Sequence, residues 1–295
     1  MPRTGSVTPD PVETRHGVRC ADGLRLIAEL TAPPSGWNGD AIIIAGALAV
    51  PTGFYRALAG FLARRGYRVI RFTYRGMDPG EWETEGHPIR LRDWGCQDIE
   101  AMIQWARERH TPRRLLMLGH SIGGQLLGLA PSAQCLDGIV LIASPSGWWG
   151  HYPHPDKLKV WLMWHLLVPV ISTLSSRFPM RLFGLGNEDI PASIAAEWAR
   201  WGRHRDYLFD PVHGLDIRRY ASIEQPLLAY YTDDDWLAPP AAVEALLAQY
   251  RKAHIRCFCL RAEDYDCPQL GHFRLFTRAM EGSFWVELAD SLDEM

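Results

Sequence analysis

A series of short apolar runs, separated by helix-like stretches, constrains the fold of this chain more than any other feature. The runs lie at residues 41–45, 67–73, 114–118, 138–143, 226–231 and 256–260. Continuous apolar runs of this length, rather than alternating ones, are typical of strands that are covered on both faces. Amphipathic stretches such as 54–65 and 91–109 fall between them. This alternation predicts an α/β fold with a mostly parallel central sheet flanked by helices.

The strand–helix alternation breaks in the middle of the chain. Residues 146–220 are rich in Trp, Pro and His, and strand-like sequence resumes after them. We therefore predict a core formed by residues 13–145 and 221–295, with 146–220 inserted as a helical cap or lid. Residues 1–12 hold three prolines and few apolar side chains, so we expect a disordered N-terminus. A chain of 295 residues suffices for one such domain with its insertion.

One segment of the insertion, Val160–Ile171, is apolar over about a dozen residues. A bilayer span needs ~20 apolar residues. We therefore expect a buried or lid helix here and no stable membrane span.

The net charge and the cysteine pattern limit which binding partners and which cellular compartment we expect for this chain. The net charge is -3, which argues against a nucleic-acid partner because phosphate binding needs a concentrated basic face. No two cysteines form a CxxC pair, so we expect buried, reduced thiols, with Cys257 and Cys259 on one face of a strand. The N-terminus has no apolar stretch typical of a secretory signal, so a cytoplasmic location is expected.

Residues 119–124 read Gly-His-Ser-Ile-Gly-Gly and lie between an apolar strand and a predicted helix at 121–129. This is the context that a nucleophile elbow requires. The nucleophile occupies a strained turn, so the residues two positions away must lack side chains, and Gly119 and Gly123 meet that need. Gly124 lets the helix pack closely. We predict Ser121 as the nucleophile.

A serine hydroxyl becomes a good nucleophile when a positioned base takes its proton, and a carboxylate orients that base. In chains with this type of elbow the order is Ser, acid, His. Three consecutive aspartates, residues 233–235, directly follow the apolar run at 226–231. Asp235 and Asp234 are the two candidates for the acid.

The base is found by its position among eleven histidines. Only His254 and His272 follow the aspartates, and His254 precedes the last predicted strand. His272 is therefore the predicted base. An oxyanion hole would use the amide of Ile122 and one amide from the loop after residue 45, with Ala47 as the first choice and Leu48 as the second.

These residues resemble the α/β-hydrolase superfamily, and most of all a sparsely characterised bacterial group of predicted serine α/β hydrolases. The stretches that carry the resemblance are residues 119–124, Tyr74–Gly76, Asp93–Trp94, Asp98, 183–191, 198–201, 233–240 and 271–274. The resemblance favours Asp235, since its spacing to Pro239 matches the turn that enters the next helix in related enzymes. It implies a hydrolase of ester-type bonds that uses neither a metal nor another cofactor.

The sequence departs from the family pattern at two places. Many relatives carry His-Gly after the third strand, where this chain has Ala45 and Gly46. The usual Asp-x-Arg-Gly after the fourth strand is replaced here by residues 73–76, Thr-Tyr-Arg-Gly. Both departures bear on the oxyanion loop, and neither removes a predicted catalytic residue.

Half of the twelve tryptophans fall in the insertion, which suggests an apolar wall over Ser121. The predicted substrate-binding residues are Leu48, Trp148, Trp149, Trp161 and Trp164. His151 and His154 have no neighbouring cysteines or carboxylates that would complete a metal site, so no metal is expected.

The sequence thus predicts hydrolysis of a carboxylic ester or thioester of a small-molecule acyl substrate, through an acyl-enzyme on Ser121. Acyl transfer to an alcohol or amine would use the same three residues and remains an alternative. A non-catalytic binding module is a second alternative, although it would retain an unused triad. A homodimer is left open.

Overall fold

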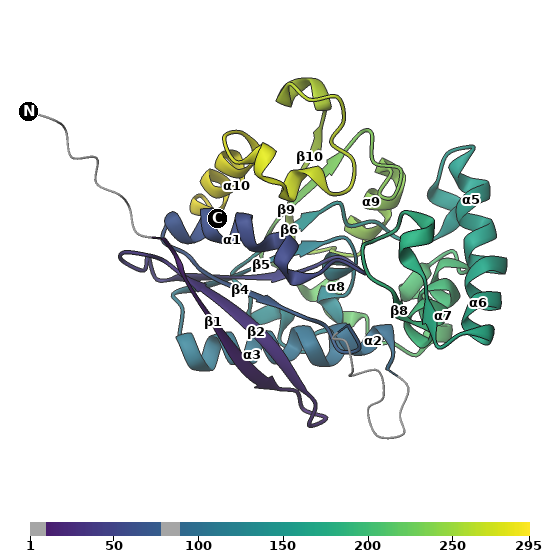
Figure 1. Cartoon of the computed structure of the whole chain (residues 1–295), viewed down its shortest axis with the longest axis horizontal. Coiled ribbons are helices and arrows are strands. Elements are labelled where there is room, and N and C mark those ends of the chain that lie inside the picture. The colour runs from purple at the N-terminus through teal and green to yellow at the C-terminus, as the bar shows by residue number, and fades with distance from the viewer. Residues whose placement is uncertain (1–9, 78–88) are drawn as a thin grey trace, which may run out of the picture.

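The structure is a computed structural model, and it describes residues 10–77 and 89–295. An eight-stranded sheet runs through the molecule in the order β1-β2-β4-β3-β5-β6-β9-β10 (Figure 1). β1 pairs with β2, and β2 with β4, in antiparallel fashion, and the other neighbouring strands are parallel. The predicted fold class, a mostly parallel sheet flanked by helices, is confirmed.

The strands of this sheet are β1 Val12–Arg19, β2 Arg25–Ala32, β3 Asp40–Ala45, β4 Arg68–Phe72, β5 Arg114–His120, β6 Gly138–Ile142, β9 Pro226–Thr232 and β10 His254–Leu260. A two-stranded sheet consists of β7 Arg177–Phe178 and β8 Ile190–Pro191. The α-helices are α1 Arg56–Arg64, α2 Leu91–Asp93, α3 Glu100–His110, α4 Ile122–Gln125, α5 Asp156–Leu162, α6 Val168–Leu174, α7 Ala192–Gly202, α8 Arg218–Ser222, α9 Pro240–Leu247 and α10 Phe284–Asp293.

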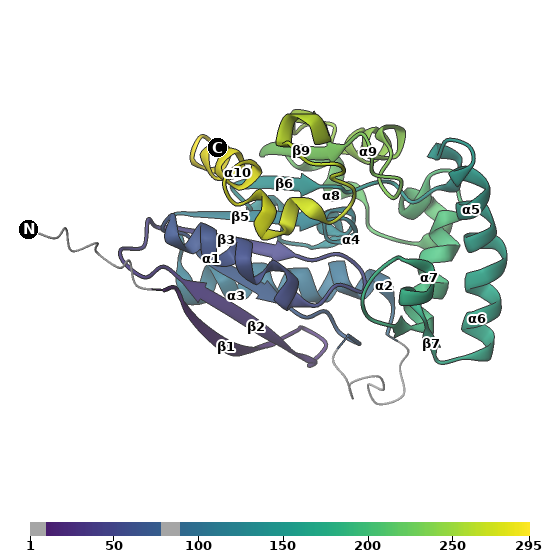
Figure 2. The same ribbon diagram turned by 45° about the horizontal axis from the view of Figure 1, so that its top comes forward.

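The central strands are buried because helices cover both faces of the sheet. Every residue of β3 and of β6 is buried. Helices α1 and α10 lie together on one face, and α3 lies on the other (Figures 1 and 2). Complete burial explains why these strands are uniformly apolar rather than alternating.

The helix after the elbow is shorter than the predicted 121–129. α4 ends at Gln125, and a 3-10 turn follows at Leu127–Leu129. Ala130 is extended, as expected for a residue before a proline. Gly128 lies against the ring of Tyr220, where a Cβ would come within 2.5 Å of ring carbons. The chain therefore leaves the helix early to pass beneath this aromatic ring.

Two other predictions from the sequence concern the N-terminal segment and the cysteines, and they differ in part from the structure. The predicted disordered segment lies largely outside the described residues, but Val12 already pairs with Ala32 in the sheet. The prediction of buried thiols is wrong for Cys135, Cys257 and Cys259, which are exposed. The last two lie in β10, an edge strand whose residues are exposed except for Leu260, so strand membership did not imply burial.

Residues 146–220 form helices α5, α6 and α7 and the β7–β8 sheet. They lie beyond the end of the main sheet toward which the arrows of β3 and β6 point (Figure 2). The carboxyl ends of the parallel strands, where ligands of such sheets bind, therefore face this helical segment.

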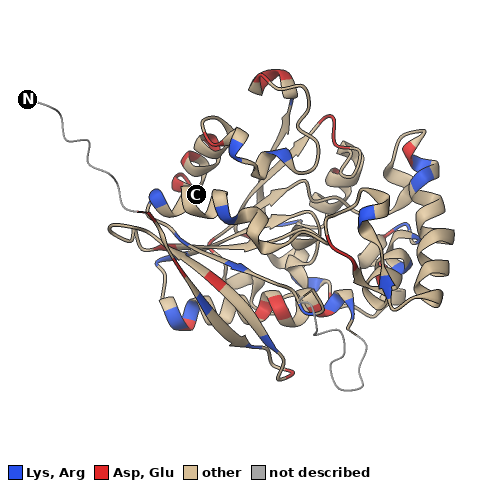
Figure 3. Ribbon diagram, in the orientation of Figure 1, with Lys and Arg blue, Asp and Glu red and all other residues tan. Residues whose placement is uncertain are grey.

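The outer helix of the segment runs from Asp156 to Leu174. It is longer than the apolar stretch seen in the sequence and, by length and composition alone, could cross a membrane. Only 22% of its apolar window is buried, and Leu158, Leu166 and Leu174 are exposed. Charged residues occur along β1, β2 and α3, whereas α6 has none (Figure 3).

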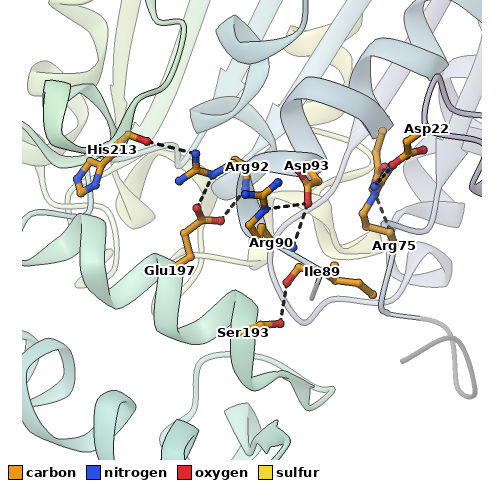
Figure 4. Close-up of polar contacts among 10 residues, drawn as sticks. Asp22, Arg75, Ile89, Arg90, Arg92, Asp93, Ser193, Glu197 and His213 are labelled. Carbon is orange, nitrogen blue, oxygen red and sulfur yellow. Dashed lines mark hydrogen bonds and ion pairs between the residues drawn. The ribbon is translucent and has the colours of Figure 1, made fainter. Parts of the chain in front are cut away.

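Polar contacts fasten the helical segment to the core (Figure 4). Arg92 contacts Glu197 of α7 through its Nε, at 2.6 Å, and through its backbone amide. The hydroxyl of Ser193 donates to the carbonyl oxygen of Ile89 at 2.6 Å. On the other side of the segment, the amide of Asn187 donates to the carbonyl oxygen of Ala49 at 2.8 Å. α7 and the loop before it are therefore held against the core.

The residues around Arg75, which carry part of the resemblance seen in the sequence, form a polar network within the core rather than at the elbow. The Arg75 guanidinium contacts Asp98 at 2.6 Å and Asp22 at 2.5 Å, and the Arg75 amide also donates to Asp98. Trp94 stacks on Tyr74 and donates its indole N–H to the Arg75 carbonyl. This network fixes the chain just after β4.

Candidate active site

Ser121 lies at the sharp turn between β5 and α4, with φ 53° and ψ -116°. A side chain in this conformation is strained and persists only where the surroundings enforce it. Gly119 and Gly123 allow the turn because they have no side chain where neighbouring backbone atoms lie against them. A Cβ on Gly123 would lie 2.1 Å from the Ala45 oxygen, and one on Gly119 would lie 2.5 Å from the Gly124 Cα. Any side chain at either position would displace the turn.

His272 and Asp235 form a buried pair. The Nδ1 of His272 lies 2.6 Å from Oδ2 of Asp235, and the two residues are 8% and 3% exposed. The other carboxylate oxygen of Asp235 accepts the backbone amide of Leu237 at 2.9 Å. Both oxygens are thus engaged, which fixes the carboxylate and orients the imidazole.

Asp234 makes different contacts from Asp235. Its two oxygens accept the backbone amides of Leu270 and Gly271 at 2.8 and 2.7 Å. Gly271 has φ +55°, a conformation that favours glycine. Asp234 therefore holds the loop that carries His272, while Asp235 contacts the imidazole itself.

Ser121 and His272 line one cavity of about 560 Å³, including its mouth. The rest of the wall is apolar or aromatic for the most part. It comprises Ala47, Leu48, Ile122, Gln125, Pro145, Gly147, Tyr152, Val160, Met163, Trp164, Leu185, Trp198, Trp236, Leu237 and Phe273. Among the described residues that line it there is no Asp, Glu, Lys or Arg, so the wall suits an uncharged, apolar group.

The structure places only part of the predicted substrate-binding set at this cavity. Leu48 and Trp164 line the wall. Trp161 is 38% exposed and stacks on His165, outside the cavity. Trp148 and Trp149 pack against each other in the turn after β6. These three tryptophans do not line the cavity as predicted.

Sequence reasoning missed several residues of the wall. Val160, Met163 and Trp164 share the i, i+3, i+4 spacing of one helix face, so Val160 and Met163 could have been chosen together with Trp164. Trp236 and Phe273 stand directly beside the predicted acid and base in sequence. Adjacency to the predicted pair was a usable signal for both.

The amide of Ala47 is already engaged, which stands against its prediction as an oxyanion donor. It donates to the hydroxyl of Tyr55 at 2.8 Å. The amides of Leu48 and Ile122, by contrast, have no acceptor among residues 10–77 and 89–295. Leu48, the second choice from the sequence, therefore offers the free donor opposite Ile122.

A model of the alpha/beta hydrolase family matches residues 41–282 of the chain, which is most of its length. The chain belongs to the alpha/beta hydrolase family. The predicted superfamily is thereby confirmed. No curated protein sequence matches the chain.

Solved structures of this hydrolase's fold include several esterases. An esterase from Pyrococcus furiosus shares 14% identity, with a TM-score of 0.63 over 96% of this chain and 91% of that one. The esterase domain of a Rhodothermus marinus protein shares 16% identity, with a TM-score of 0.58 over 95% and 97%. A Xanthomonas campestris serine hydrolase without a lid also shares 16%, with a TM-score of 0.52 over 96% and 92%. At these identities the likeness shows the fold.

A buried hydrogen-bond chain connects the loop after β3 of this hydrolase with the loop of His272. The Tyr55 hydroxyl lies 2.8 Å from Nδ1 of His120, and Nε2 of His120 lies 2.9 Å from the carbonyl oxygen of His272. A carbonyl oxygen only accepts, so Nε2 of His120 carries the proton. Nδ1 then accepts from Tyr55, whose oxygen accepts from Ala47. Each donor in the chain has one acceptor.

Burial, and then the neighbouring His272, lowers the pKa of His120 well below its usual value. In the unfolded chain a histidine titrates near a pKa of ~6.5. As the pH falls below this value, the unfolded state binds a proton that the folded state refuses, so the free energy of unfolding decreases. The stabilisation by neutral His120 is present above pH ~6.5 and is lost in acid.

We therefore expect the free energy of unfolding of His120→Asn to depend less on pH than that of the wild type. The slopes should differ by up to about 1.4 kcal/mol per pH unit between pH ~6.5 and ~5. Denaturant titrations at several pH values measure both slopes. Burial also lowers the pKa of His110, His151 and His213, but these residues are present in both proteins. Equal slopes would show that folding does not lower the pKa of His120.

Proposed function

We propose that this alpha/beta hydrolase cleaves carboxylic esters or thioesters of apolar acyl groups through an acyl-enzyme on Ser121. The observation that carries the proposal is the buried His272–Asp235 pair at the wall of the same cavity as Ser121. A nucleophile, a base and an orienting carboxylate are the minimum that such chemistry needs.

In the first step the Ser121 hydroxyl attacks the ester carbonyl and passes its proton to Nε2 of His272. Asp235 accepts a hydrogen bond from Nδ1–H of His272, which keeps Nε2 free to act as a base and stabilises the imidazolium. His272 then protonates the leaving alcohol or thiol, leaving the acyl group on Ser121. In the second step water attacks the acyl-enzyme with His272 again as the base, and His272 then returns the proton to the Ser121 oxygen as the carboxylic acid leaves.

We propose the amides of Leu48 and Ile122 as the oxyanion hole. Both are backbone donors on the cavity wall and neither has an acceptor among the described residues. Such donors stabilise the charge that develops on the carbonyl oxygen in the transition state. The helical segment 146–220 is proposed as the cap, since Val160, Met163 and Trp164 contribute the apolar wall of the cavity.

A fluorophosphonate probe tests the nucleophile without knowledge of the natural substrate. We expect the probe to label the wild type and to leave Ser121→Ala unlabelled, because the probe reacts with an activated serine. Ser144→Ala is the matched control, since Ser144 is buried nearby and its hydroxyl donates to backbone oxygens. Labelling of folded Ser121→Ala, or none of the folded wild type, would refute the proposed nucleophile.

A further inference from the structure

Gln125 is a buried polar residue on the otherwise largely apolar wall of the cavity. It ends α4, four residues after Ser121, and only 2% of its surface is exposed. An amide side chain in such a place is unfavourable unless its donors and acceptor are paired. The hydrogen-bond partners of the amide oxygen and nitrogen of Gln125 therefore indicate which kind of ligand group can bind there.

The neighbouring side chains fix which way the amide faces. The indole Nε1 of Trp198 lies 2.9 Å from the Tyr207 hydroxyl, and this hydroxyl lies 2.7 Å from Oε1 of Gln125. An indole N–H can only donate, so the Tyr207 oxygen accepts from Trp198. The Tyr207 proton is then free to be donated, and Oε1 of Gln125 is its acceptor. If the amide were flipped, its NH₂ group would face the Tyr207 hydroxyl, and the Tyr207 proton would lose its acceptor on Gln125.

This orientation leaves the Nε2 amino group of Gln125 without a partner. Within residues 10–77 and 89–295 no acceptor pairs with it. Trp198 and Tyr207 hold the amide in place, since Tyr207 is fully buried and both rings pack against the core. Two N–H donors are thus held ready at the wall of the cavity that contains Ser121.

We propose that Gln125 binds a hydrogen-bond acceptor on the substrate chain that fills the cavity. The inference rests on the proposed function and deepens it by naming the substrate class. This class comprises esters with a largely apolar chain that carries one carbonyl, ether or hydroxyl oxygen. The described wall has no charged side chain, so the acceptor is neutral. A plain hydrocarbon chain of the same length would cover these donors and leave them unpaired, which a site of this kind discriminates against.

The test compares pairs of nitrophenyl esters of equal chain length, one a plain alkanoyl ester and one with an ether or keto oxygen in the chain. The oxygen is moved along the chain one atom at a time, and a second series places it in the alcohol group. Each kcat/KM is divided by the rate of hydrolysis by hydroxide, which removes the intrinsic effect of the oxygen. We expect a maximum at one position, with a preference of about 10-fold over the plain ester.

Gln125→Met removes the donors and keeps the length of the side chain. We expect it to abolish the roughly 10-fold preference. The preference is a ratio measured on one protein, so a loss of folded enzyme cancels. A merely structural role, as the acceptor of the Tyr207 hydroxyl, would lower both rates in proportion. Tyr207→Phe removes that role, and in its background Gln125→Met should still lower the preference.

Three outcomes separate this inference from the proposed function. A preference that Gln125→Met abolishes in the wild type and lowers in the Tyr207→Phe background supports the donor site. A wild type that hydrolyses both members of every pair equally, or a preference unchanged by Gln125→Met, overturns it and assigns the amide to an ordered water. If Ser121→Ala hydrolyses the esters as fast as the wild type, the proposed function itself fails.

Discussion

Ser121→Ala, His272→Ala and the variant with both changes should lower kcat for a short-chain nitrophenyl ester by about the same factor, ~10⁶. The reason is that the hydroxyl and the imidazole act in one step, in which one attacks while the other takes its proton. Removal of either group ends the covalent route, so removal of the second costs little more. Activity above the rate in water should remain, because the proposed oxyanion donors, the backbone amides of Leu48 and Ile122, are unchanged in these variants.

The double variant is the informative member of this set. If its loss were close to the product of the two single losses, Ser121 and His272 would act independently and the shared step would be wrong. Thermal unfolding of each variant checks that the fold is intact, and Ser144→Ala again serves as the matched serine control. A kcat of His272→Ala within about tenfold of the wild type would likewise exclude this imidazole as the base.

The sequence was sufficient for the parts of this molecule that depend on local pattern. Continuous apolar runs identify the buried strands because both faces of β3 and β6 are covered. The glycines around Ser121 identify the elbow, because a Cβ at Gly119 or Gly123 would collide with backbone. These signals are steric and short in range, so they can be seen without the fold.

Signals that depend on contacts between distant residues could not be seen in the same way. The amide of Ala47 is engaged only because Tyr55, on the far side of a turn, points its hydroxyl back toward it. Trp161 and Trp164 are equally apolar, and the direction of one helix face decides which of them meets the cavity. Gln125 looks like an ordinary helix residue until Tyr207, which lies 82 positions further on, orients its amide.

A second large effect on kcat is expected at the adjacent residues Asp234 and Asp235. Asp235→Asn should lower kcat by ~10⁴, as expected when the carboxylate behind a catalytic histidine becomes an amide. Asp235 accepts a hydrogen bond from Nδ1–H of His272 at 2.6 Å. An amide in its place can donate to Nδ1, which moves the imidazole proton to Nε2. The nitrogen that should take the Ser121 proton is then already protonated.

Asp234→Asn is the matched change, because it alters the same chemical group at the adjacent position. Asp234 accepts two backbone amides, and an asparagine can accept one of them while its NH₂ opposes the other. The result should be a looser His272 loop, with a lower melting temperature and a loss in kcat of about tenfold. The larger loss of kcat in Asp235→Asn would reflect control of the His272 tautomer, whereas the smaller loss in Asp234→Asn would reflect the position of the His272 loop. If Asp234→Asn lost more kcat than Asp235→Asn, the carboxylate that orients His272 during the reaction would be Asp234, and the loop would have to move to bring it there.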